Sequence, residues 1–379
     1  MARRNNPSGR VRVIINALHA KTGGGVTYLR NILPHLAAEP GLELHLFLHA
    51  DQFELFGVPP EGVRIHLLEY RNSFLRLMIW EQLALPILAR EMGADVTFSL
   101  ANYGPLLAPN PVIVLRNSLA VVRRERRLSK WAYWAGLAVA TLASLVGCRS
   151  AIAVSDYARR VLSFGMPAVF RGKTTIIHHG VDARFTPAEP AVPRRPDELL
   201  VVSDVYVQKN LHTLIRAMAT VVRTHPATRL VIAGRLVDAE YHGELLQLAR
   251  ECGVTESVTF LGGQTPAELL GLYRRCTAFV FPSTVETFGN PLVEAMACGA
   301  PVVCSNSAAM PEVAGDAVLY VDPLDEGAMA ATILSLLDDA ALRDQLAARA
   351  MARATSYSWA ETGRQTAQVL LRAAAKGAS

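Results

Sequence analysis

The chain has 379 residues, of which 51% are apolar and 19% are charged. At about 100–200 residues per domain, this length indicates two domains, and the apolar content excludes wholesale disorder. The 26 glycines and 21 prolines follow no period, which excludes collagen-like and coiled-coil chains. The formal net charge of +5, from 38 basic and 33 acidic side chains, is too small to require nucleic acid as a partner.

The cysteines and the N-terminus indicate a reducing compartment and no signal peptide. The five cysteines contain no CxxC pair, so neither a disulfide framework nor a zinc ribbon is expected. The apolar run Val11–Ala17 follows a basic start, but it is short and Arg12 interrupts it. We interpret it as a leader followed by a first strand. The expected location is therefore cytoplasmic.

The first half of the chain alternates short apolar runs with helical patterns. Such alternation predicts a parallel sheet with helices on both faces. The predicted helices include Val26–Ala38, Trp80–Met92 and Asp156–Leu162. The predicted strands are Val11–Asn16, Leu42–His49, Val63–Leu68, Val96–Ser99, Val112–Leu115, Ala151–Val154 and Thr175–Ile177.

One apolar segment has two interpretations that the sequence leaves open. Trp131–Cys148 contains no charged residue, and its length is near the lower limit for spanning a bilayer. It is either a buried helix or a helix that lies on an anionic membrane surface; a true membrane span is not expected. The second interpretation draws on the basic residues just before it, Arg123, Arg124, Arg126, Arg127 and Lys130.

A proline-rich stretch separates this half from a second one with the same alternation. Pro187, Pro190, Pro193 and Pro196 interrupt both helix and strand and mark a linker. The pattern then restarts, so the sequence predicts two doubly wound α/β domains facing across a cleft, where a small-molecule site is common. The second-half strands are predicted at Leu199–Ser203, Leu230–Ala233, Val258–Leu261, Ala278–Phe281, Val302–Cys304 and Val318–Val321, and the helices at Leu211–Val222, Tyr241–Cys252, Pro266–Arg275 and Pro291–Ala297.

The segment 281–303 places two carboxylates at the end of a predicted strand. It reads Phe-Pro-Ser-Thr-Val-Glu-Thr-Phe-Gly-Asn-Pro-Leu-Val-Glu-Ala-Met-Ala-Cys-Gly-Ala-Pro-Val-Val. Glu286 lies in a loop, and a helix is predicted to begin near Pro291, with Asn290 as its cap and Glu294 in its first turn. The free N–H groups of such a helix start suit hydroxyls or anions. Complementing the helix dipole would explain Glu294 alone, but not Glu286 in the same loop.

Glu286 and Glu294 match the E-x7-E motif of retaining GT-B glycosyltransferases, and the chain resembles glycosyltransferase family 4 (group 1). The residues between and after them resemble the core signature of that family nearly throughout. The resemblance is specific from about Val201 to Asp322. Further matches are Met310-Pro-Glu-Val-Ala-Gly-Asp316, Lys209-Asn210, Gly23-Gly24-Gly25 after the first strand, and His179-Gly-Val-Asp182.

The resemblance implies a division of the chain as well as a fold. Residues 1–190 would form an N-terminal, acceptor-side Rossmann-like domain, and residues 197–355 a C-terminal domain that binds the nucleotide sugar. Residues 356–379 would form a helix that crosses back towards the first domain. The proline-rich linker and this helix are the expected hinge for closure over the donor.

The resemblance also implies residue roles. Glu286 would contact hydroxyls of the donor sugar, and Lys209 would neutralise the diphosphate. Glu294 would hold the ribose of the nucleotide. Further donor contacts are expected from the main-chain N–H groups of Phe288 and Gly289, from Asn290, and from the Gly24–Gly25 loop, which approaches the phosphates.

Two departures from the family pattern bear on these roles. The family often has Gly-Arg where this chain has Ser203-Asp204, which leaves Asp204 on the donor side without the usual arginine. It also often has His-Asp where this chain has Arg116-Asn117. Arg116 would either restore positive charge at the diphosphate or bind an anionic acceptor.

The implied reaction is a metal-independent hexosyl transfer with retention, from a GDP- or UDP-sugar and without a further cofactor. The leaving phosphate assists on the same face, so no protein nucleophile is required, and Lys209 stabilises the leaving group. The two carboxylates fit binding better than a glycosidase acid and nucleophile pair. No Asp-x-Asp follows a strand and the histidines form no ligand set, so no metal site is expected.

The acceptor is expected on the first domain, beside Asn102, Tyr103 and Asn117. With the arginine cluster and segment 123–148 nearby, a glycan on a lipid carrier at the inner face of the cell membrane fits, as in bacterial surface polysaccharide synthesis. Two alternatives remain. One is a nucleotide-sugar epimerase on the same fold, and the other is a catalytically silent scaffold that binds nucleotide sugar or glycan.

Overall fold

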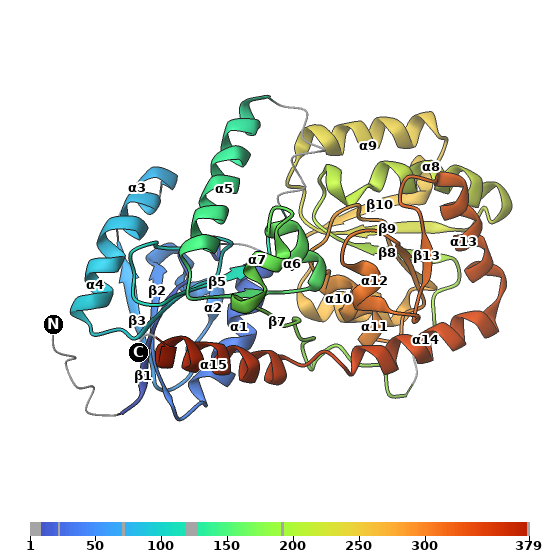
Figure 1. The fold of residues 1–379 in the computed structure, drawn as a ribbon. Coiled ribbons are helices and arrows are strands. Elements are labelled where there is room, and N and C mark those ends of the chain that lie inside the picture. The colour runs from blue at the N-terminus through green and yellow to red at the C-terminus, as the bar shows by residue number, and fades with distance from the viewer. Residues whose placement is uncertain (1–8, 22, 70–72, 119–127, 191–192, 377–379) are drawn as a thin grey trace. The chain divides into compact units, whose positions relative to one another are not determined.

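The computed structural model describes residues 9–21, 23–69, 73–118, 128–190 and 193–376 (Figure 1). Arg123, Arg124, Arg126 and Arg127 of the basic cluster lie outside the described residues. The chain divides into two compact units. The N-terminal unit comprises Met1–Gly180 with Ser358–Ser379, and the C-terminal unit comprises Val181–Tyr357.

Within its described residues, the N-terminal unit has a parallel sheet in the order β3-β2-β1-β4-β5-β6-β7. The strands are rich in buried aliphatic side chains, as a sheet covered on both faces requires. The strand order reverses between β1 and β4, so this is the topological switch point of the sheet. The strands are β1 Val11–Asn16, β2 Leu42–His49, β3 Val63–Leu68, β4 Val96–Ser99, β5 Pro111–Leu115, β6 Ser150–Ala153 and β7 Thr174–Ile176.

The segment predicted as one helix at Trp80–Met92 is more complex. The helix begins earlier, with α3 (Phe74–Ile79), passes through a π-helical turn η2 (Trp80–Ala84) and continues as α4 (Leu85–Glu91). Pro86 lies in the first turn of α4 and has no N–H group for a regular helical bond. Further helices of this unit are α1 Gly24–Ala37, α2 Phe53–Phe56, α6 Asp156–Leu162 and α7 Pro167–Phe170. Two short 3-10 turns are η1 Ala50–Gln52 and η4 Arg171–Lys173.

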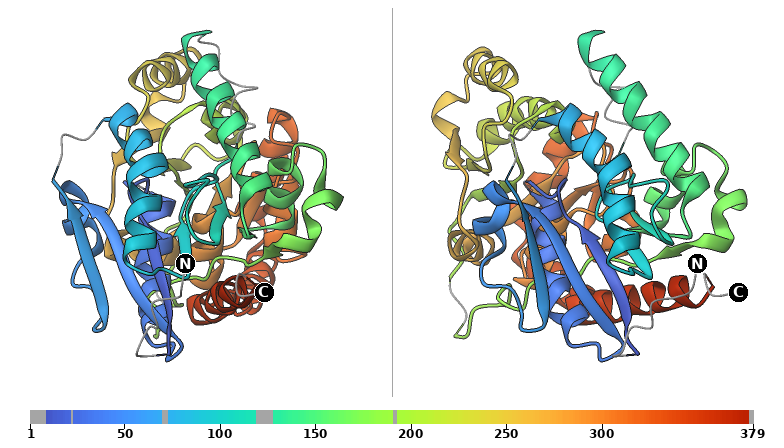
Figure 2. Two further views of the ribbon diagram at one scale, coloured as in Figure 1. Left: turned by 60° about the vertical axis from the view of Figure 1, so that its left-hand side comes forward. Right: turned by 90° about the vertical axis from the view of Figure 1, so that its left-hand side faces the viewer.

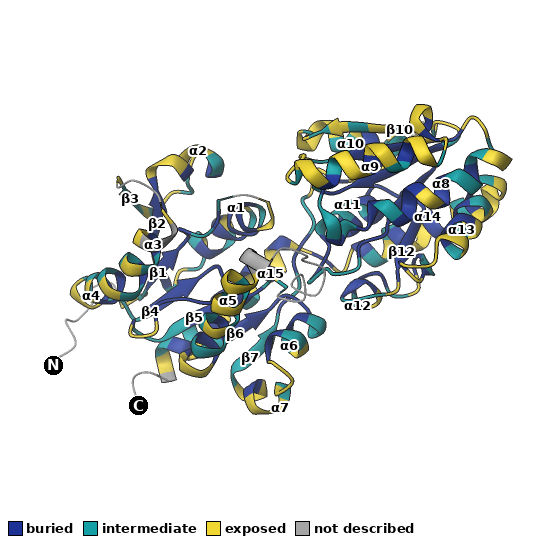
Figure 3. Ribbon diagram, turned by 90° about the horizontal axis from the view of Figure 1, so that it is seen from above, coloured by how far each residue is buried: buried dark blue, intermediate teal, exposed yellow. Residues whose placement is uncertain are grey.

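The apolar segment forms helix α5 (Leu128–Gly147), which extends away from the sheet (Figures 1 and 2). The buried-helix interpretation is wrong, because most described side chains of α5 are exposed or half-exposed (Figure 3). Val139 is 69% exposed, and Trp131 and Tyr133 are also exposed. Among the described residues, no helix has both the length and the apolar character that crossing a membrane requires.

The C-terminal unit repeats the architecture, with the described parallel strands in the order β10-β9-β8-β11-β12-β13. Its order reverses between β8 and β11, which is its switch point. The predicted doubly wound α/β fold is confirmed for both sheets, and each strand begins and ends within one residue of its prediction. The strands are β8 Glu198–Val202, β9 Arg229–Ala233, β10 Val258–Gly262, β11 Ala278–Phe281, β12 Val302–Ser305 and β13 Leu319–Val321.

A buried aliphatic core joins this sheet to helices α8 and α13. Helix α8 is strongly amphipathic, and its buried face includes Leu214, Met218 and Val221. The helices of the unit are α8 Leu211–Thr224, α9 Ala239–Glu251, α10 Pro266–Arg275, α11 Asn290–Ala297, α12 Met310–Ala314, α13 Glu326–Asp338 and α14 Ala340–Ala354, with 3-10 turns η5 Val207–Lys209 and η6 Thr255–Ser257.

The last helix, α15 (Trp359–Lys376), packs on the N-terminal unit, against α1 and the sheet (Figure 2). The Thr362 hydroxyl donates to the carbonyl of His178 at 2.8 Å. The proline-rich stretch instead packs on the C-terminal unit, since the Arg194 guanidinium donates to the carbonyls of Cys276 and Gly299. The chain therefore passes between the units at residues 180–181 and 357–358.

Candidate functional site

Lys209 and Glu286 form a close ion pair at the switch point of the C-terminal sheet. Lys209 ends the turn that follows β8, and Glu286 lies in the loop that follows β11, so neighbouring strands deliver both side chains to one edge. The two side chains are only 12% and 15% exposed. The structure thus brings together two of the three residues that the sequence predicts as catalytic.

Buried hydrogen bonds hold the two loops together. The Asn210 side chain donates to the carbonyl of Pro282 at 3.1 Å, and the main-chain N–H of Thr284 donates to the carbonyl of Gln208 at 3.0 Å. Asn210 is fully buried and adopts the left-handed conformation, which asparagine tolerates better than most residues. The ion pair therefore rests on a rigid main-chain frame.

The electrostatics of the pair favour the charged lysine. Burial on its own lowers the pKa of Lys209, but the negative Glu286 carboxylate outweighs it and raises the pKa above its usual value. The Lys209 ammonium also lies over the Tyr206 ring, 5.4 Å from its centroid. The site consequently keeps a fixed positive charge beside a carboxylate.

Asp204 is held by an arginine that the sequence analysis did not single out. The Arg235 main-chain N–H and its Nε both donate to Asp204 Oδ1 at 3.1 Å. Arg235 follows the end of β9, next to β8, and these bonds raise its pKa. Where the family pattern has arginine at residue 204, this chain thus has an aspartate that orients an arginine from the neighbouring strand. No local motif marks Arg235 in the sequence.

The start of helix α11 differs from its prediction. The helix begins at Asn290, and its N-cap residue is Gly289, not Asn290. Gly289 has a φ of +88°, a conformation that side chains disfavour. No acidic residue lies in the first turn, because Glu294 is one turn further along. The neighbouring Phe288 is buried and packs edge-on against Tyr357.

Glu294 is a buried acid beside a tyrosine. The Tyr273 hydroxyl donates to its Oε2 at 3.0 Å. Burial raises the pKa of Glu294 to about 7; the bond from Tyr273 opposes the shift, Asp182 adds to it and Arg184 opposes it. A carboxyl that titrates near neutral pH is a common feature of ligand sites.

In the N-terminal unit, Arg116 and Gly25 lie against each other at the start of α1. A Cβ atom on Gly25 would come within 2.3 Å of the Arg116 guanidinium, so the absence of a side chain makes this contact possible. The Arg116 Nε donates to the carbonyl of Leu100 at 2.6 Å. Burial lowers the pKa of Arg116 to about 10, while Tyr28 opposes the shift. A cation beside a helix N-terminus suits an anionic ligand.

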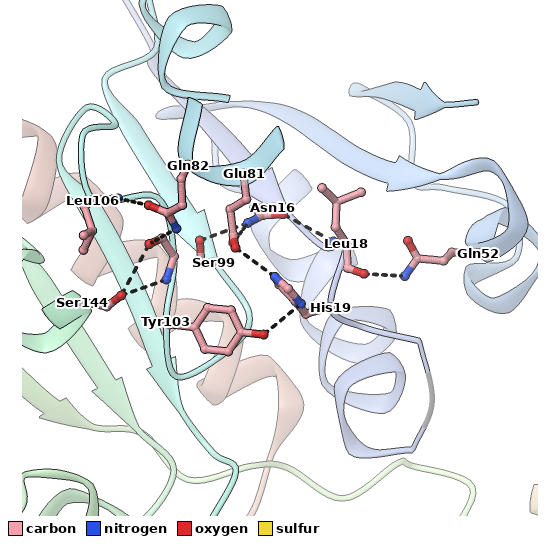
Figure 4. A network of polar contacts seen from close by, with 11 residues as sticks. Asn16, Leu18, His19, Gln52, Glu81, Gln82, Ser99, Tyr103, Leu106 and Ser144 are labelled. Atoms are coloured by element: carbon pink, nitrogen blue, oxygen red, sulfur yellow. Dashed lines mark hydrogen bonds and ion pairs between the residues drawn. The ribbon is translucent and has the colours of Figure 1, made fainter. Parts of the chain in front are cut away.

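Among the predicted acceptor-side residues, Asn102 holds the main chain at Arg116 and Asn117. The Asn102 Oδ1 accepts the main-chain N–H groups of Arg116 at 2.9 Å and Asn117 at 3.0 Å. Tyr103 belongs to a second, buried network with His19 and Glu81 (Figure 4). Sequence analysis missed both partners, because Glu81 lies in a predicted helix and His19 in the loop after the first strand, and no local spacing links them.

The Lys209–Glu286 pair predicts a strong energetic coupling. Replacing Lys209 with Met leaves Glu286 without its ion-pair partner, so the free energy of unfolding should fall by about 3 kcal/mol. The double variant Lys209→Met/Glu286→Gln should lose much less than the sum of the two single changes. Denaturant titrations of the four proteins measure the coupling. Additive losses would contradict it, and the exposed Glu361–Arg364 pair is the matched control.

Glu294 predicts a pH-dependent stability. Its folded-state pKa is raised to about 7, so the fold disfavours the carboxylate, and stability falls as pH rises from about 4.5 to about 7. Glu294→Gln is neutral at every pH and keeps an acceptor for Tyr273. Thermal melts should therefore show a larger gain in Tm for this variant at pH 8 than at pH 5. An equal gain at both pH values would show that Glu294 is not the titrating group.

The C-terminal unit matches a known protein family. Residues 182–353 match the family model described as "Glycosyl transferases group 1". The glycogen synthase of Mycobacterium tuberculosis is 37% identical over 203 residues, which cover 52% of this chain and 48% of that protein. The O-antigen chain mannosyltransferase B of Escherichia coli is 32% identical over 245 residues, covering 59% and 60% of the two chains. The chain thus spans about half the length of the curated relatives it matches.

Solved structures are similar over nearly the whole chain. Sucrose-phosphate synthase from Thermosynechococcus elongatus superposes with a TM-score of 0.76 at 21% identity, covering 96% of this chain and 98% of that one. WaaG, a glycosyltransferase involved in lipopolysaccharide biosynthesis, gives a TM-score of 0.73 at 16% identity, covering 95% and 99%. At these identities the likeness shows the fold alone. The chain therefore has the GT-B fold, and its residues 182–353 form a glycosyl transferases group 1 domain.

Proposed function

We propose that this protein is a retaining, metal-independent glycosyltransferase of family 4. It moves a hexosyl group from a nucleoside-diphosphate sugar to a glycan or lipid-linked glycan, in bacterial surface polysaccharide synthesis. The observation that carries the proposal is the Lys209–Glu286 pair at the switch point of a group 1 domain. One relative, the O-antigen chain mannosyltransferase B, has a name that describes the same kind of reaction.

In this proposal the donor lies at the carboxyl edge of β8 and β11. Lys209 and Arg235 hold the diphosphate, and Glu286 accepts hydrogen bonds from the sugar hydroxyls. The Lys209–Glu286 ion pair separates when the donor binds, because the diphosphate carries more negative charge than one carboxylate and attracts Lys209 more strongly. The main-chain N–H groups of Phe288 and Gly289 face the same sugar, beside the first residue of α11, Asn290. Glu294 holds the ribose.

The chemical step requires the leaving diphosphate to be stabilised and the proton of the acceptor hydroxyl to be removed. Lys209 and Arg235 supply fixed positive charge at the point where negative charge develops. In the N-terminal unit, Arg116 with the helix start at Gly24 and Gly25 is a separate source of positive charge that suits an anionic group of a substrate. The leaving phosphate oxygen takes the acceptor proton on the same face, which gives retention without a protein nucleophile.

The two alternative functions have less support. An epimerase needs no acceptor, whereas the relatives reported above are named as synthases or transferases. The departures from the family pattern at Asp204 and Arg116 favour a silent scaffold, but Arg235 provides an arginine at the same sheet edge as Asp204.

The apolar helix α5 supports a peripheral position on a membrane. Trp131, Tyr133, Val139 and Val146 are exposed along it, and aromatic side chains favour the interface between lipid and water. The basic segment before α5 supplies positive charge for an anionic surface. We propose contact through residues 123–148 on the cytoplasmic face.

Nucleotide binding tests the proposed donor site. We expect either GDP or UDP to raise the Tm of the protein by mass action. Lys209→Met should weaken that nucleotide about tenfold or more, because a charge-assisted bond to the diphosphate is lost. Lys173→Met, a change to a lysine of the N-terminal unit, is the control. Absence of a Tm shift with GDP, UDP and their hexose conjugates would leave the donor proposal without its ligand and favour the scaffold.

Vesicle binding tests the membrane contact. The double variant Trp131→Ser/Tyr133→Ser should bind vesicles of phosphatidylglycerol and phosphatidylcholine about tenfold more weakly than the unchanged chain. Val58→Ser/Val169→Ser changes two exposed valines elsewhere on the same unit and should bind normally. Sedimentation with the vesicles gives the comparison. Equal binding by both double variants would rule α5 out as the contact.

A further inference from the structure

A chain of hydrogen bonds runs through the N-terminal unit from a buried carboxylate to a tyrosine hydroxyl (Figure 4). The Asn16 side chain donates to Glu81 Oε1 at 2.5 Å, and His19 Nε2 lies 3.0 Å from Glu81 Oε2. The other ring nitrogen, His19 Nδ1, lies 3.2 Å from the Tyr103 hydroxyl. The His19 and Tyr103 rings meet edge to face, with centroids 4.8 Å apart. Four residues from three segments thus form one continuous network.

Such a network is costly to bury. Glu81 has no exposed surface, and removing a carboxylate from water costs several kcal/mol unless partners offset it. The Glu81 carboxylate is bonded by a neutral amide and a histidine, and within the part of the chain that the structure describes no lysine or arginine pairs with it. The π-helical turn Trp80–Ala84 carries Glu81 into this position, and π turns occur frequently at functional sites. An apolar side chain at position 81 would fill the same space in the core without the free-energy cost of removing a carboxylate from water.

The network lies where an open α/β sheet binds ligands. Asn16 ends β1, His19 follows it in the loop to α1, and Tyr103 follows β4. The strands β1 and β4 flank the switch point of this sheet, as β8 and β11 do in the other unit. The Glu81 side chain has no exposed surface, whereas the His19 side chain is 12% exposed, and Tyr103 as a whole residue is 7% exposed. The network is therefore least buried at its tyrosine–histidine end, in the loop between β1 and α1 and after β4.

The partners determine the direction of the hydrogen bonds. A carboxylate only accepts, so His19 Nε2 carries the proton and donates it to Glu81. In the neutral imidazole, His19 Nδ1 is then an acceptor, and the Tyr103 hydroxyl donates to it. Burial raises the pKa of Tyr103, and Glu81 adds to this, so the hydroxyl keeps its proton. With that proton committed to His19, the oxygen of Tyr103 is left with lone pairs to accept a hydrogen bond from a ligand.

We propose that Tyr103 and His19 form a binding site for a hydroxyl of a pyranoside, with Glu81 as the positioning residue that fixes the histidine. The ligand hydroxyl donates to Tyr103, Tyr103 donates to His19, and His19 donates to Glu81. Bonds that all run in one direction strengthen one another, so the ligand oxygen becomes more electron-rich. The assignment of this ligand as the sugar acceptor rests on the proposed transferase function. The hydroxyl site itself does not.

Binding of methyl α-D-mannopyranoside and methyl α-D-glucopyranoside to the full chain, followed by saturation-transfer NMR, tests the site. We expect at least one of them to bind, and Tyr103→Phe to weaken it about tenfold, since the ring stays and only the hydroxyl is lost. His225→Gln, which removes a surface histidine paired with Asp338, is the matched control and should bind normally. No binding to the unchanged chain, or equal binding by Tyr103→Phe, overturns the proposal.

A second readout separates positioning from a merely structural role. The ring nitrogens of His19, observed by 15N NMR, should show the proton on Nε2 and a change at Nδ1 when the pyranoside is added. In Glu81→Gln the amide can donate to Nε2, so the proton should move to Nδ1 and the bonds should reverse. An unchanged His19 tautomer in a folded Glu81→Gln protein contradicts the positioning role. Nucleotide affinity should remain normal in Tyr103→Phe, so failure of the donor site and failure of this site give different results.

Discussion

The ion pair between Lys209 and Glu286 is the interaction on which the candidate site of the C-terminal unit depends. It joins the loops after β8 and β11, the two strands between which the order of the sheet reverses. At such a switch point the chain leaves the two strands towards opposite faces of the sheet, and this is where open α/β sheets have their ligand crevice. A paired lysine and carboxylate keep this crevice charged without leaving either charge unpaired in a partly dry environment.

The two units apply one architectural rule with different chemistry. In the C-terminal unit the switch point carries Lys209 paired with Glu286, and Arg235 oriented by Asp204. These two cations and two carboxylates together suit a phosphate and a polyol. In the N-terminal unit it carries amides, a histidine and a tyrosine above a buried carboxylate. The first set has fixed charges for an anion. The second is a directional hydrogen-bond network suited to a neutral hydroxyl.

Both sites hold ionisable groups under conditions that disfavour their charges. Burial raises the pKa of Glu294 to about 7 and lowers the pKa of Arg116 to about 10. An apolar side chain of similar size packs in an interior without this desolvation cost. Perturbed ionisable groups at the carboxyl edges, where open α/β sheets bind ligands, are therefore candidate binding residues.

The sequence by itself determined the fold class and most strand positions. Continuous runs such as Val11–Asn16 and Ala278–Phe281 are apolar on both faces, and only a covered parallel sheet satisfies them. It also singled out Glu286, Glu294 and Lys209 as candidates, because a resemblance extending over the whole segment is more specific than any single residue, and the structure pairs Lys209 with Glu286. The sequence did not determine whether α5 is buried or exposed, since the same apolar residues suit a helix in the core and a helix on a membrane surface.

Only the tertiary structure decided which distant residues meet. Arg235 reaches Asp204 because β9 pairs with β8, and Glu81 reaches His19 because a π-helical turn lies against the end of β1. No sequence period or spacing marks either of these two side-chain contacts, since both arise from the order of the strands in the sheet. Sequence patterns record what each residue prefers along its own segment, whereas the partners of a buried charge are set by the packing of segments that lie far apart in the chain.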